Sequence, residues 1–171
     1  MQRIFHTPEG VRDIYNGECS QKRKVQEKIH RVFHQYGYED IETPTFEYFE
    51  VFSREVGTIP SKELYKFFDR EGNTLVLRPD FTPSVSRACA TYFSPDKEPV
   101  SFCYTGNTFI NNTSYRGHLK ETTQMGVERI GDESADADAE LLAMTVECLL
   151  AAGLTEFQVS VGQVEDRKSV V

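Results

Sequence analysis

The chain has few cysteines and no long hydrophobic run, and each shortage excludes a class of protein. Its four cysteines are widely spaced and form no Cys-x-x-Cys pair, which indicates buried free thiols in a reducing cytoplasm rather than a disulfide framework. They are Cys19, Cys89, Cys103 and Cys148. No apolar run is long enough to span a bilayer, and the N-terminus lacks the apolar core of a signal peptide, so we expect a cytoplasmic protein without membrane association.

Positive charge is also scarce. The chain carries 19 Lys and Arg against 27 Asp and Glu, a net charge of −8, and the sequence contains no dense run of basic residues. Because binding to a phosphate backbone depends on clustered cations, we expect no nucleic-acid partner, neither tRNA nor DNA. The 171 residues are enough for one domain with its own core, without a disulfide or metal staple.

A metal site and a cofactor are likewise not predicted. His30 and His34 are four residues apart on a predicted helix and can share one face. No third ligand with matching spacing follows in the sequence, so solvated helix residues are the better interpretation.

The predicted elements follow the order of an α+β domain. After an extended arm over residues 1–17, apolar residues at helical spacing predict a helix from Ser20, as N-cap, to Tyr36, with Gly37 as its left-handed C-terminal cap. Short strands are predicted at 38–41, 64–68, 73–77 and 157–161, and further helices at 83–92 and 139–152, the last preceded by an acidic run. The aromatic segment 46–56 indicates a turn or short helix with its phenylalanines packed inward.

The stretch from Tyr104 to Glu128 predicts a long β-hairpin, because β-branched and aromatic residues flank a polar loop. In the returning strand Gln124, Gly126 and Glu128 point the same way, and the glycine removes the side chain between an amide and a carboxylate. This arrangement favours a flat space with polar walls for a small polar ligand. The alternative is an ordinary surface strand with a glycine at a bulge.

Asp80 and Thr82 lie at a predicted strand-to-helix junction, before the helix that Pro83 begins. Short polar side chains at such a junction can contact a ligand, but they also stand where plain helix capping would place them. The chemistry of the residues leaves both interpretations open.

Three segments, at residues 36–44, 77–82 and 104–128, resemble the core of the class II aminoacyl-tRNA synthetases of the histidyl type. The chain is most similar to the paralogue family that serves as regulatory subunit of ATP phosphoribosyltransferase in bacterial histidine biosynthesis. The resemblance implies an antiparallel sheet flanked by helices, with residues 1–171 forming a single domain that is the N-terminal part of a longer core. It also implies a partner, the short catalytic subunit of ATP phosphoribosyltransferase.

The resemblance further implies that the chain is not an enzyme. In histidyl-tRNA synthetases an arginine, a variable residue and a glutamate follow the aromatic residue that matches Phe109, and the arginine pairs with the α-phosphate of ATP. Here these positions hold Ile110, Asn111 and Asn112. An isoleucine donates nothing to a phosphate, and one strong electrostatic contact is worth about 3 kcal/mol or more to such a reaction.

The amino-acid end of the family's pocket is better kept. By resemblance, Asp80 and Thr82 stand where an α-ammonium group is received, Gln124 supplies an amide near it, and Glu128 stands where a glutamate contacts an imidazole. Such charge-assisted hydrogen bonds are the strong ones. Asp80 replaces the usual glutamate and has a shorter reach. We therefore expect a histidine-like pocket without catalysis.

The end of the chain, the charged run 165–169, departs from the family, which continues with further helix and strands. This predicts a shortened chain whose exposed sheet edges and apolar faces favour self-association. Two competing hypotheses remain open: a divergent or fragmentary histidyl-tRNA synthetase with ATP-dependent aminoacylation, and a synthetase-like binding module with another ligand.

Overall fold

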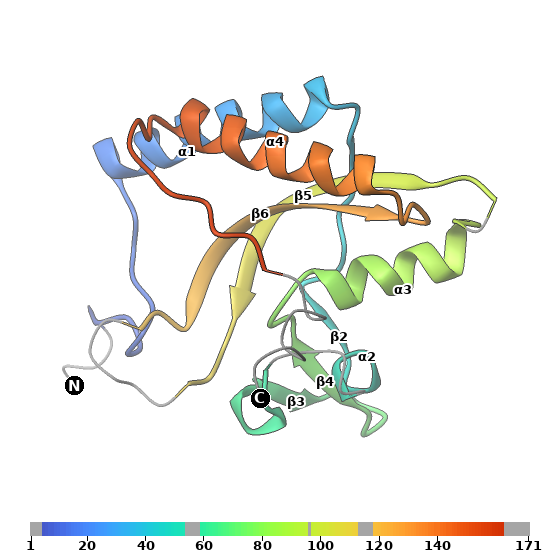
Figure 1. The fold of residues 1–171 in the computed structure, drawn as a ribbon. Helices are drawn as coiled ribbons and strands as arrows, with labels where there is room; N and C mark the ends of the chain where they lie inside the picture. The colour runs from blue at the N-terminus through green and yellow to red at the C-terminus, as the bar shows by residue number, and fades with distance from the viewer. Residues whose placement is uncertain (1–4, 54–58, 96, 113–117, 163–171) are drawn as a thin grey trace, which may run out of the picture.

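Two three-stranded sheets, with helices on both sides of the larger one, make up the fold (Figure 1). The structure is a computed structural model and describes residues 5–53, 59–95, 97–112 and 118–162. The larger sheet has the strand order β1-β5-β6 and the smaller one the order β2-β4-β3. None of the described helices is long and apolar enough to cross a membrane.

The larger sheet is built on the predicted hairpin. Strand β5, Val100–Phe109, and strand β6, Glu121–Ile130, pair antiparallel over ten residues each, from Val100 opposite Ile130 to Phe109 opposite Glu121. Strand β1, Glu39–Asp40, adds to β5 in parallel. The hairpin prediction is confirmed, and because side chains alternate along a strand, its register assigns every residue to one of two faces.

Helices α1, Asn16–Gln35, and α4, Ala135–Ala152, lie side by side across one face of this sheet (Figure 1). The main core forms between them and the strands, and its buried members are Val32, Phe33, Tyr38, Cys103 and Met144. Helix α3, Thr82–Tyr92, covers the opposite face through Val85 and Cys89, which pack against Phe102. Most apolar burial in the chain thus depends on the two faces of one hairpin.

The smaller sheet contains the second predicted hairpin, strands β3, Lys66–Phe68, and β4, Thr74–Leu77. Its other edge is β2, Phe46–Tyr48, which leads into the short helix α2, Glu50–Ser53, and a 3-10 turn, η2, at Ser61–Glu63. The buried Glu47 of β2 accepts hydrogen bonds of 3.0 and 2.7 Å from the guanidinium of Arg87 on α3. This ion pair ties the smaller sheet to the helix that borders the larger one.

Several local expectations were wrong. Helix α1 begins at Asn16, and Tyr15, not Ser20, is its N-cap residue, without a side-chain hydrogen bond. Within the described part of segment 46–56, a strand precedes the helix, and Phe46 is 49% exposed because it lies on an open face of the small sheet rather than in a core. Residues 54–56 lie outside the described residues.

The C-terminal part also differs from the prediction. Helix α4 starts at Ala135, four residues earlier than expected, because Ser134 caps it by accepting a 3.2 Å hydrogen bond from the backbone N–H of Ala137. Its end at Gly153, with φ of +102°, is as predicted. Residues 157–161, which the structure describes, form no strand, because alternation of apolar residues needs a neighbouring strand to become a ladder.

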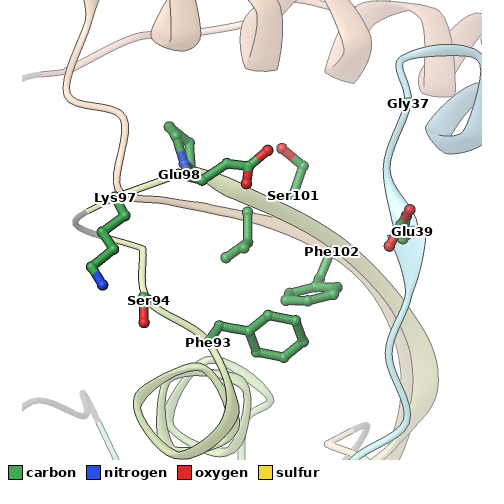
Figure 2. A pocket seen from close by; sticks show the side chains of 10 residues that line it. Gly37, Glu39, Phe93, Ser94, Lys97, Glu98, Ser101 and Phe102 are labelled. Atoms are coloured by element: carbon green, nitrogen blue, oxygen red, sulfur yellow. The ribbon is translucent and has the colours of Figure 1, made fainter.

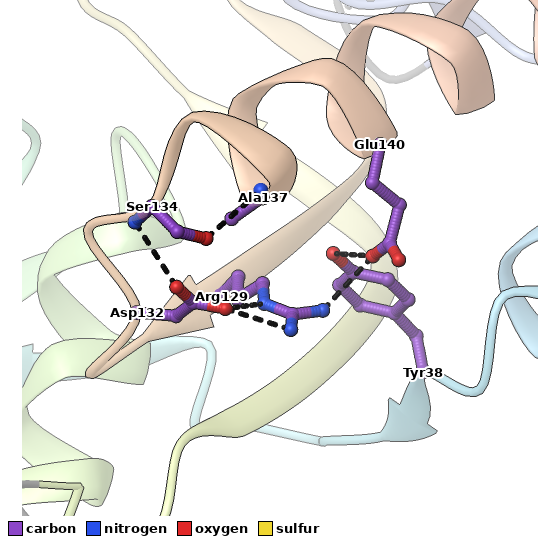
Figure 3. A network of polar contacts seen from close by, with 6 residues as sticks. All are labelled: Tyr38, Arg129, Asp132, Ser134, Ala137 and Glu140. Carbon is purple, nitrogen blue, oxygen red and sulfur yellow. Dashed lines mark hydrogen bonds and ion pairs between the residues drawn. The ribbon is translucent and has the colours of Figure 1, made fainter.

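A polar network holds the start of α4 against the sheet (Figure 3). Arg129 of β6 donates to Asp132 and to Glu140 of α4 at 2.9 Å each, and the Tyr38 hydroxyl reaches the same Glu140 oxygen at 3.4 Å. Asp132 also accepts from the backbone N–H of Ser134, the cap residue. The network fixes the turn between β6 and α4, so the helix docks in one orientation over the core.

Candidate functional site

The strand-to-helix junction at Asp80 is the first part of the candidate site. Strand β4 ends at Leu77, and α3 begins at Thr82 with Pro83 in its first turn. Asp80 Oδ1 accepts a 2.7 Å hydrogen bond from the backbone N–H of Phe81, the N-cap residue of the helix. Asp80 therefore braces the junction. Thr82 lies inside the helix and makes no capping bond, so the capping alternative is wrong for Thr82.

The hydroxyl of Thr82 points instead to the hairpin. Thr82 Oγ1 donates a 2.5 Å hydrogen bond to Oε1 of Glu128, on β6. The two residues are 46 positions apart in the chain, and the contact exists because α3 packs on the face of the sheet that carries Glu128. Two of the predicted site residues are thus in direct contact, and Asp80 lies near enough for its charge to act on the Glu128 carboxyl.

The space beside Gly126 is filled, contrary to the prediction of an open, flat space. Tyr104 stands opposite Gly126 in the β5–β6 register, and a Cβ added to the glycine would collide with the Tyr104 hydroxyl and ring. The ring of Tyr104 stacks on Phe81 with the centroids 4.2 Å apart and the planes 10° from parallel. Gly126 therefore admits an aromatic ring rather than leaving a hollow.

Gln124 lies apart from the other three predicted site residues. It faces the same side of the sheet, but it is four residues from Glu128, roughly 13 Å along an extended strand. Its cross-strand partner is Gly106, over which Arg78 and Phe81 pack, since a Cβ there would lie 2.6 Å from the guanidinium of Arg78. The structure brings together Asp80, Thr82 and Glu128. The stacked rings of Tyr104 and Phe81 pack between these three residues and Gln124.

The electrostatics of this group favour a cationic ligand. Burial raises the pKa of the Glu128 carboxyl, and the charge of Asp80 raises it further, whereas the hydrogen bond from Thr82 opposes the rise. Burial, followed by the charges of Glu128 and Asp80, also raises the pKa of Tyr104. Two carboxylates beside an aromatic surface, with hydroxyl groups as their neighbours, form a half-buried negative site that an ammonium or imidazolium group would neutralise.

Arg78 does not supply that positive charge. Its guanidinium is buried, donates to the backbone carbonyls of Asn107 at 2.8 Å and Thr43 at 2.9 Å, and lies 4.1 Å over the Phe81 ring. Burial lowers its pKa. Arg78 therefore joins the end of β4 to β5 as a structural cation, and its Nε and Nη1 donors are engaged by backbone carbonyls.

Sequence reasoning missed Tyr104, Arg78 and Phe81 as parts of this site. A signal for Tyr104 was present, because an aromatic residue that faces a glycine across an antiparallel pair commonly covers it. Finding it required the pairing register of β5 and β6, which the burial of both faces and the geometry of the turn set together. No pattern in the sequence indicated that Arg78 would turn to backbone carbonyls.

Two surface clefts lie away from the group of Asp80, Thr82 and Glu128. One, of about 550 Å³, lies between β1, β5 and the segment after α3 (Figure 2), and its apolar wall is the edge-to-face pair of Phe93 and Phe102, 5.1 Å apart. The other, of about 610 Å³, lies under the far end of the hairpin, where Lys22 donates to Thr123 at 2.6 Å. Neither cleft includes Asp80, Thr82, Gln124 or Glu128, so neither is the predicted pocket.

The fold and this site define a protein of the class II aminoacyl-tRNA synthetase type. The crystal structure of an ATP phosphoribosyltransferase regulatory subunit/histidyl-tRNA synthetase from Bacillus halodurans matches 96% of the chain with a TM-score of 0.84 at 36% identity, and the chain covers 42% of it. The apo histidyl-tRNA synthetase of S. aureus matches 87% of the chain with a TM-score of 0.69 at 28% identity, and 35% of that structure is covered.

A family model described as histidyl-tRNA synthetase matches residues 10–170, and the chain belongs to this family. A relative from Ruminiclostridium cellulolyticum, named ATP phosphoribosyltransferase regulatory subunit, is 46% identical over 94% of the chain and 38% of its own length. A relative of the same name from Acetivibrio thermocellus is 43% identical over 98% of the chain and 40% of its own length. The chain thus spans about two fifths of the length of these relatives.

Replacing Gly126 with alanine tests the packing of Tyr104. The added Cβ would displace a ring held by Phe81, so we expect Gly126→Ala to lower the free energy of unfolding by about 1–3 kcal/mol. Gly17 is the matched control, because it lies in α1 with open space around it, and alanine there should be neutral or stabilising by up to about 1 kcal/mol. Urea unfolding of both variants decides, and equal effects at the two glycines would contradict the packing described here.

The raised pKa of Glu128 predicts a pH effect on stability. Between the ordinary glutamate pKa of 4.5 and the raised value, the folded chain binds more protons than the unfolded chain, so this residue makes stability fall as the pH rises through that window. Glu128→Gln should remove this part of the pH dependence. Thr82→Val should extend the window upward, because it removes the hydrogen bond that holds the pKa down. Urea unfolding of the three proteins at a series of pH values measures both effects, and superimposable pH profiles would refute the assignment.

Proposed function

We propose that this chain is part of a non-catalytic, cytoplasmic regulatory subunit of ATP phosphoribosyltransferase, the enzyme of the first step of histidine biosynthesis. The observation that carries the proposal is the 46% identity, over nearly the whole chain, to a relative that bears this name. The Bacillus halodurans structure, whose name joins the regulatory subunit and the synthetase, is consistent with it. The partner would be the short catalytic subunit.

The absence of catalysis is supported by the residues at the nucleotide end of the hairpin. Ile110 stands where the synthetases have the phosphate-binding arginine, and its backbone N–H donates to the Lys120 carbonyl at 2.9 Å, which holds it in the hairpin ladder. The nearby Arg78 is engaged elsewhere, because two backbone carbonyls and the Phe81 ring contact its guanidinium. Adenylation would therefore lack a contact worth about 3 kcal/mol or more.

A histidine-like pocket is supported by the residues at the end of the hairpin away from its loop. Asp80, Thr82 and Glu128 converge from the α3 junction and β6. The pKa of Glu128 is raised, and a bound cationic ligand would lower it, because a neighbouring positive charge favours the ionised carboxylate. Histidine carries an α-ammonium and an imidazole, which match the two carboxylates. Its binding would give the subunit a means to transmit feedback by the product of the pathway, provided that the ligand favours one state of the complex.

Self-association also belongs to this proposal. Strand β6 is the edge of the larger sheet in the described part of the chain, with ten residues whose outer side is open to a further strand. Phe68 and Tyr48 of the smaller sheet are 73% and 54% exposed. An open edge and exposed aromatic residues favour association with a second copy or with the rest of a longer chain.

Mixing the protein with a short catalytic subunit tests the proposal. We expect the two to sediment together and phosphoribosyl transfer to rise about 5-fold or more, the lower end of ordinary allosteric coupling, with histidine reversing the rise. Separate sedimentation together with an unchanged rate would overturn the proposal.

A divergent histidyl-tRNA synthetase is the second candidate, and the family model and the S. aureus structure favour it. Histidine-dependent exchange of pyrophosphate into ATP would support it. We expect no exchange above background, because of Ile110.

Histidine titration tests the pocket directly. One charge-assisted hydrogen bond is worth about 1.5–3 kcal/mol, so Glu128→Gln should weaken histidine binding by about 10-fold or more in calorimetry. Thr91→Val is the control, because Thr91 is exposed at the other end of α3 and its hydroxyl bonds only the Arg87 carbonyl. Absence of histidine binding, both alone and with the catalytic subunit, would remove the pocket from the proposal but leave the regulatory assignment standing.

A further inference from the structure

Four metal-ligating side chains from three elements converge on the face of the larger sheet that α1 covers. His30 and His34 lie one turn apart on α1, with their rings 4.2 Å apart. Asp40 belongs to β1, and Cys103 to β5. One ligand atom from each residue lies within 4.8 Å of the other three. The sequence shows no third ligand near the two histidines, because Asp40 and Cys103 come from other elements.

The chain path explains the convergence. Helix α1 ends at Gln35, and Gly37, with φ of +82°, turns the chain back so that β1 runs beneath the last turns of the helix. Asp40 and Cys103 are register partners in the parallel β1–β5 pair, so their side chains leave the sheet on the same side. That side is the one facing His30 and His34, because Cys103 packs in the core with Val32 and Phe33 of α1.

The Asp40 carboxylate is the centre of the cluster. Its Oδ1 lies 2.5 Å from His30 Nε2, and its Oδ2 lies 3.1 Å from His34 Nε2. The Cys103 thiol, fully buried, donates to Oδ1 at 3.5 Å. The side chains of His30, His34 and Asp40 are 38%, 46% and 57% exposed, so a cation has access from solvent while the sulfur forms the floor of the site.

We propose that His30, His34, Asp40 and Cys103 form a binding site for a zinc-like divalent cation. Two imidazoles, a carboxylate and a thiolate are ligands that zinc accepts in tetrahedral sites. With metal–nitrogen and metal–oxygen bonds of about 2.0 Å and one metal–sulfur bond of about 2.3 Å, the ligand atoms of such a tetrahedral site stand roughly 3.3–3.5 Å apart. The ligand atoms lie from 2.5 Å apart, between His30 Nε2 and Asp40 Oδ1, up to 4.8 Å apart. Metal binding therefore requires the first pair to separate and the widest pair to close, which side-chain rotation at the half-buried His30 and the exposed His34 can supply.

The plain alternative is a hydrogen-bonded cluster in which the rings of His30 and His34 contact the carboxylate of Asp40. Hydrogen bonding alone explains why the two histidines contact the carboxylate. The metal site is favoured because the buried sulfur of Cys103 is directed at the same carboxylate oxygen and completes a set of four ligands, of three chemical types. Binding of the cation would release the Cys103 thiol proton to solvent, and each imidazole would bind in its neutral form, so the affinity falls at low pH.

The site would act as a staple. Strand β1 pairs with β5 through only two residues, and the cation would join both strands to α1. A cation that binds the folded chain and not the unfolded chain raises the unfolding temperature in proportion to the logarithm of its concentration. The segment so held includes Tyr38, whose hydroxyl contacts Glu140 of α4, so the staple would also steady the α1–β1 corner of the core.

Zinc and cobalt binding to the chelator-treated 171-residue chain test the proposal. We expect one zinc per chain by elemental analysis after dialysis, a higher unfolding temperature with zinc, and a cobalt adduct with tetrahedral d–d bands and a thiolate-to-cobalt charge-transfer band. His30→Gln, at a half-buried position, and His34→Gln, at an exposed one, should weaken zinc binding by at least about 100-fold, since even partners outside the ligand set are worth 10–100-fold. Cys103→Ser should abolish the charge-transfer band.

Controls of the same residue types separate this site from weak surface binding. His118→Gln and Cys19→Ser change a histidine and a cysteine outside the cluster and should leave zinc affinity and the cobalt spectrum unchanged. Because Cys103 is buried and its replacement can impair folding, the two histidine variants carry the decision. Zinc binding that is absent, that is unaffected by His30→Gln and His34→Gln, or that gives a cobalt adduct without the thiolate band would overturn the proposal.

Discussion

The alternation of side chains along the β5–β6 hairpin is the constraint on which the structure depends. One register, set over ten pairs, directs Cys103, Met125 and Val127 toward α1 and α4 and directs Phe102, Tyr104 and Glu128 toward α3. A slip by a single residue would exchange the two faces and destroy both cores together. The candidate pocket and the proposed cation site lie on opposite faces of this one ladder, so both inherit their geometry from it.

The face toward α3 brings Asp80, Thr82 and Glu128 together beside the aromatic rings of Tyr104 and Phe81. Thr82 and Glu128 are hydrogen-bonded to each other, and Tyr104 fills the space next to Gly126 and stacks on Phe81. The result is a negative group of side chains closed by aromatic rings, with the nearby Arg78 turned away to backbone carbonyls. Such a site favours a small cation over a nucleotide, because the phosphates of a nucleotide would be repelled by the carboxylates of Asp80 and Glu128.

Much of the fold was predictable because the governing signals are local. The hairpin, the β3–β4 pair and the end of α4 at Gly153 follow from residue patterns within a few positions. The errors occurred where the deciding partner is far away in the chain. Segment 46–56 becomes partly a strand because β4 pairs with it, and 157–161 forms no strand because no neighbour in the described residues pairs with it. The early start of α4 has a different cause, because the acidic residues that the sequence predicts before the helix, Asp136 and Asp138, form its first turn and complement its positive N-terminal end.

By itself the sequence determined the class of fold and the family, since these depend on residue identity and on spacing along the chain, and it holds an isoleucine at position 110, where the resemblance implies an arginine. Only the tertiary structure decided that Tyr104 closes the space at Gly126 and that Asp40 and Cys103 join His30 and His34. The physical reason is that these contacts join residues brought together by strand register and helix docking, which depend on the burial of two whole faces and not on any local pattern.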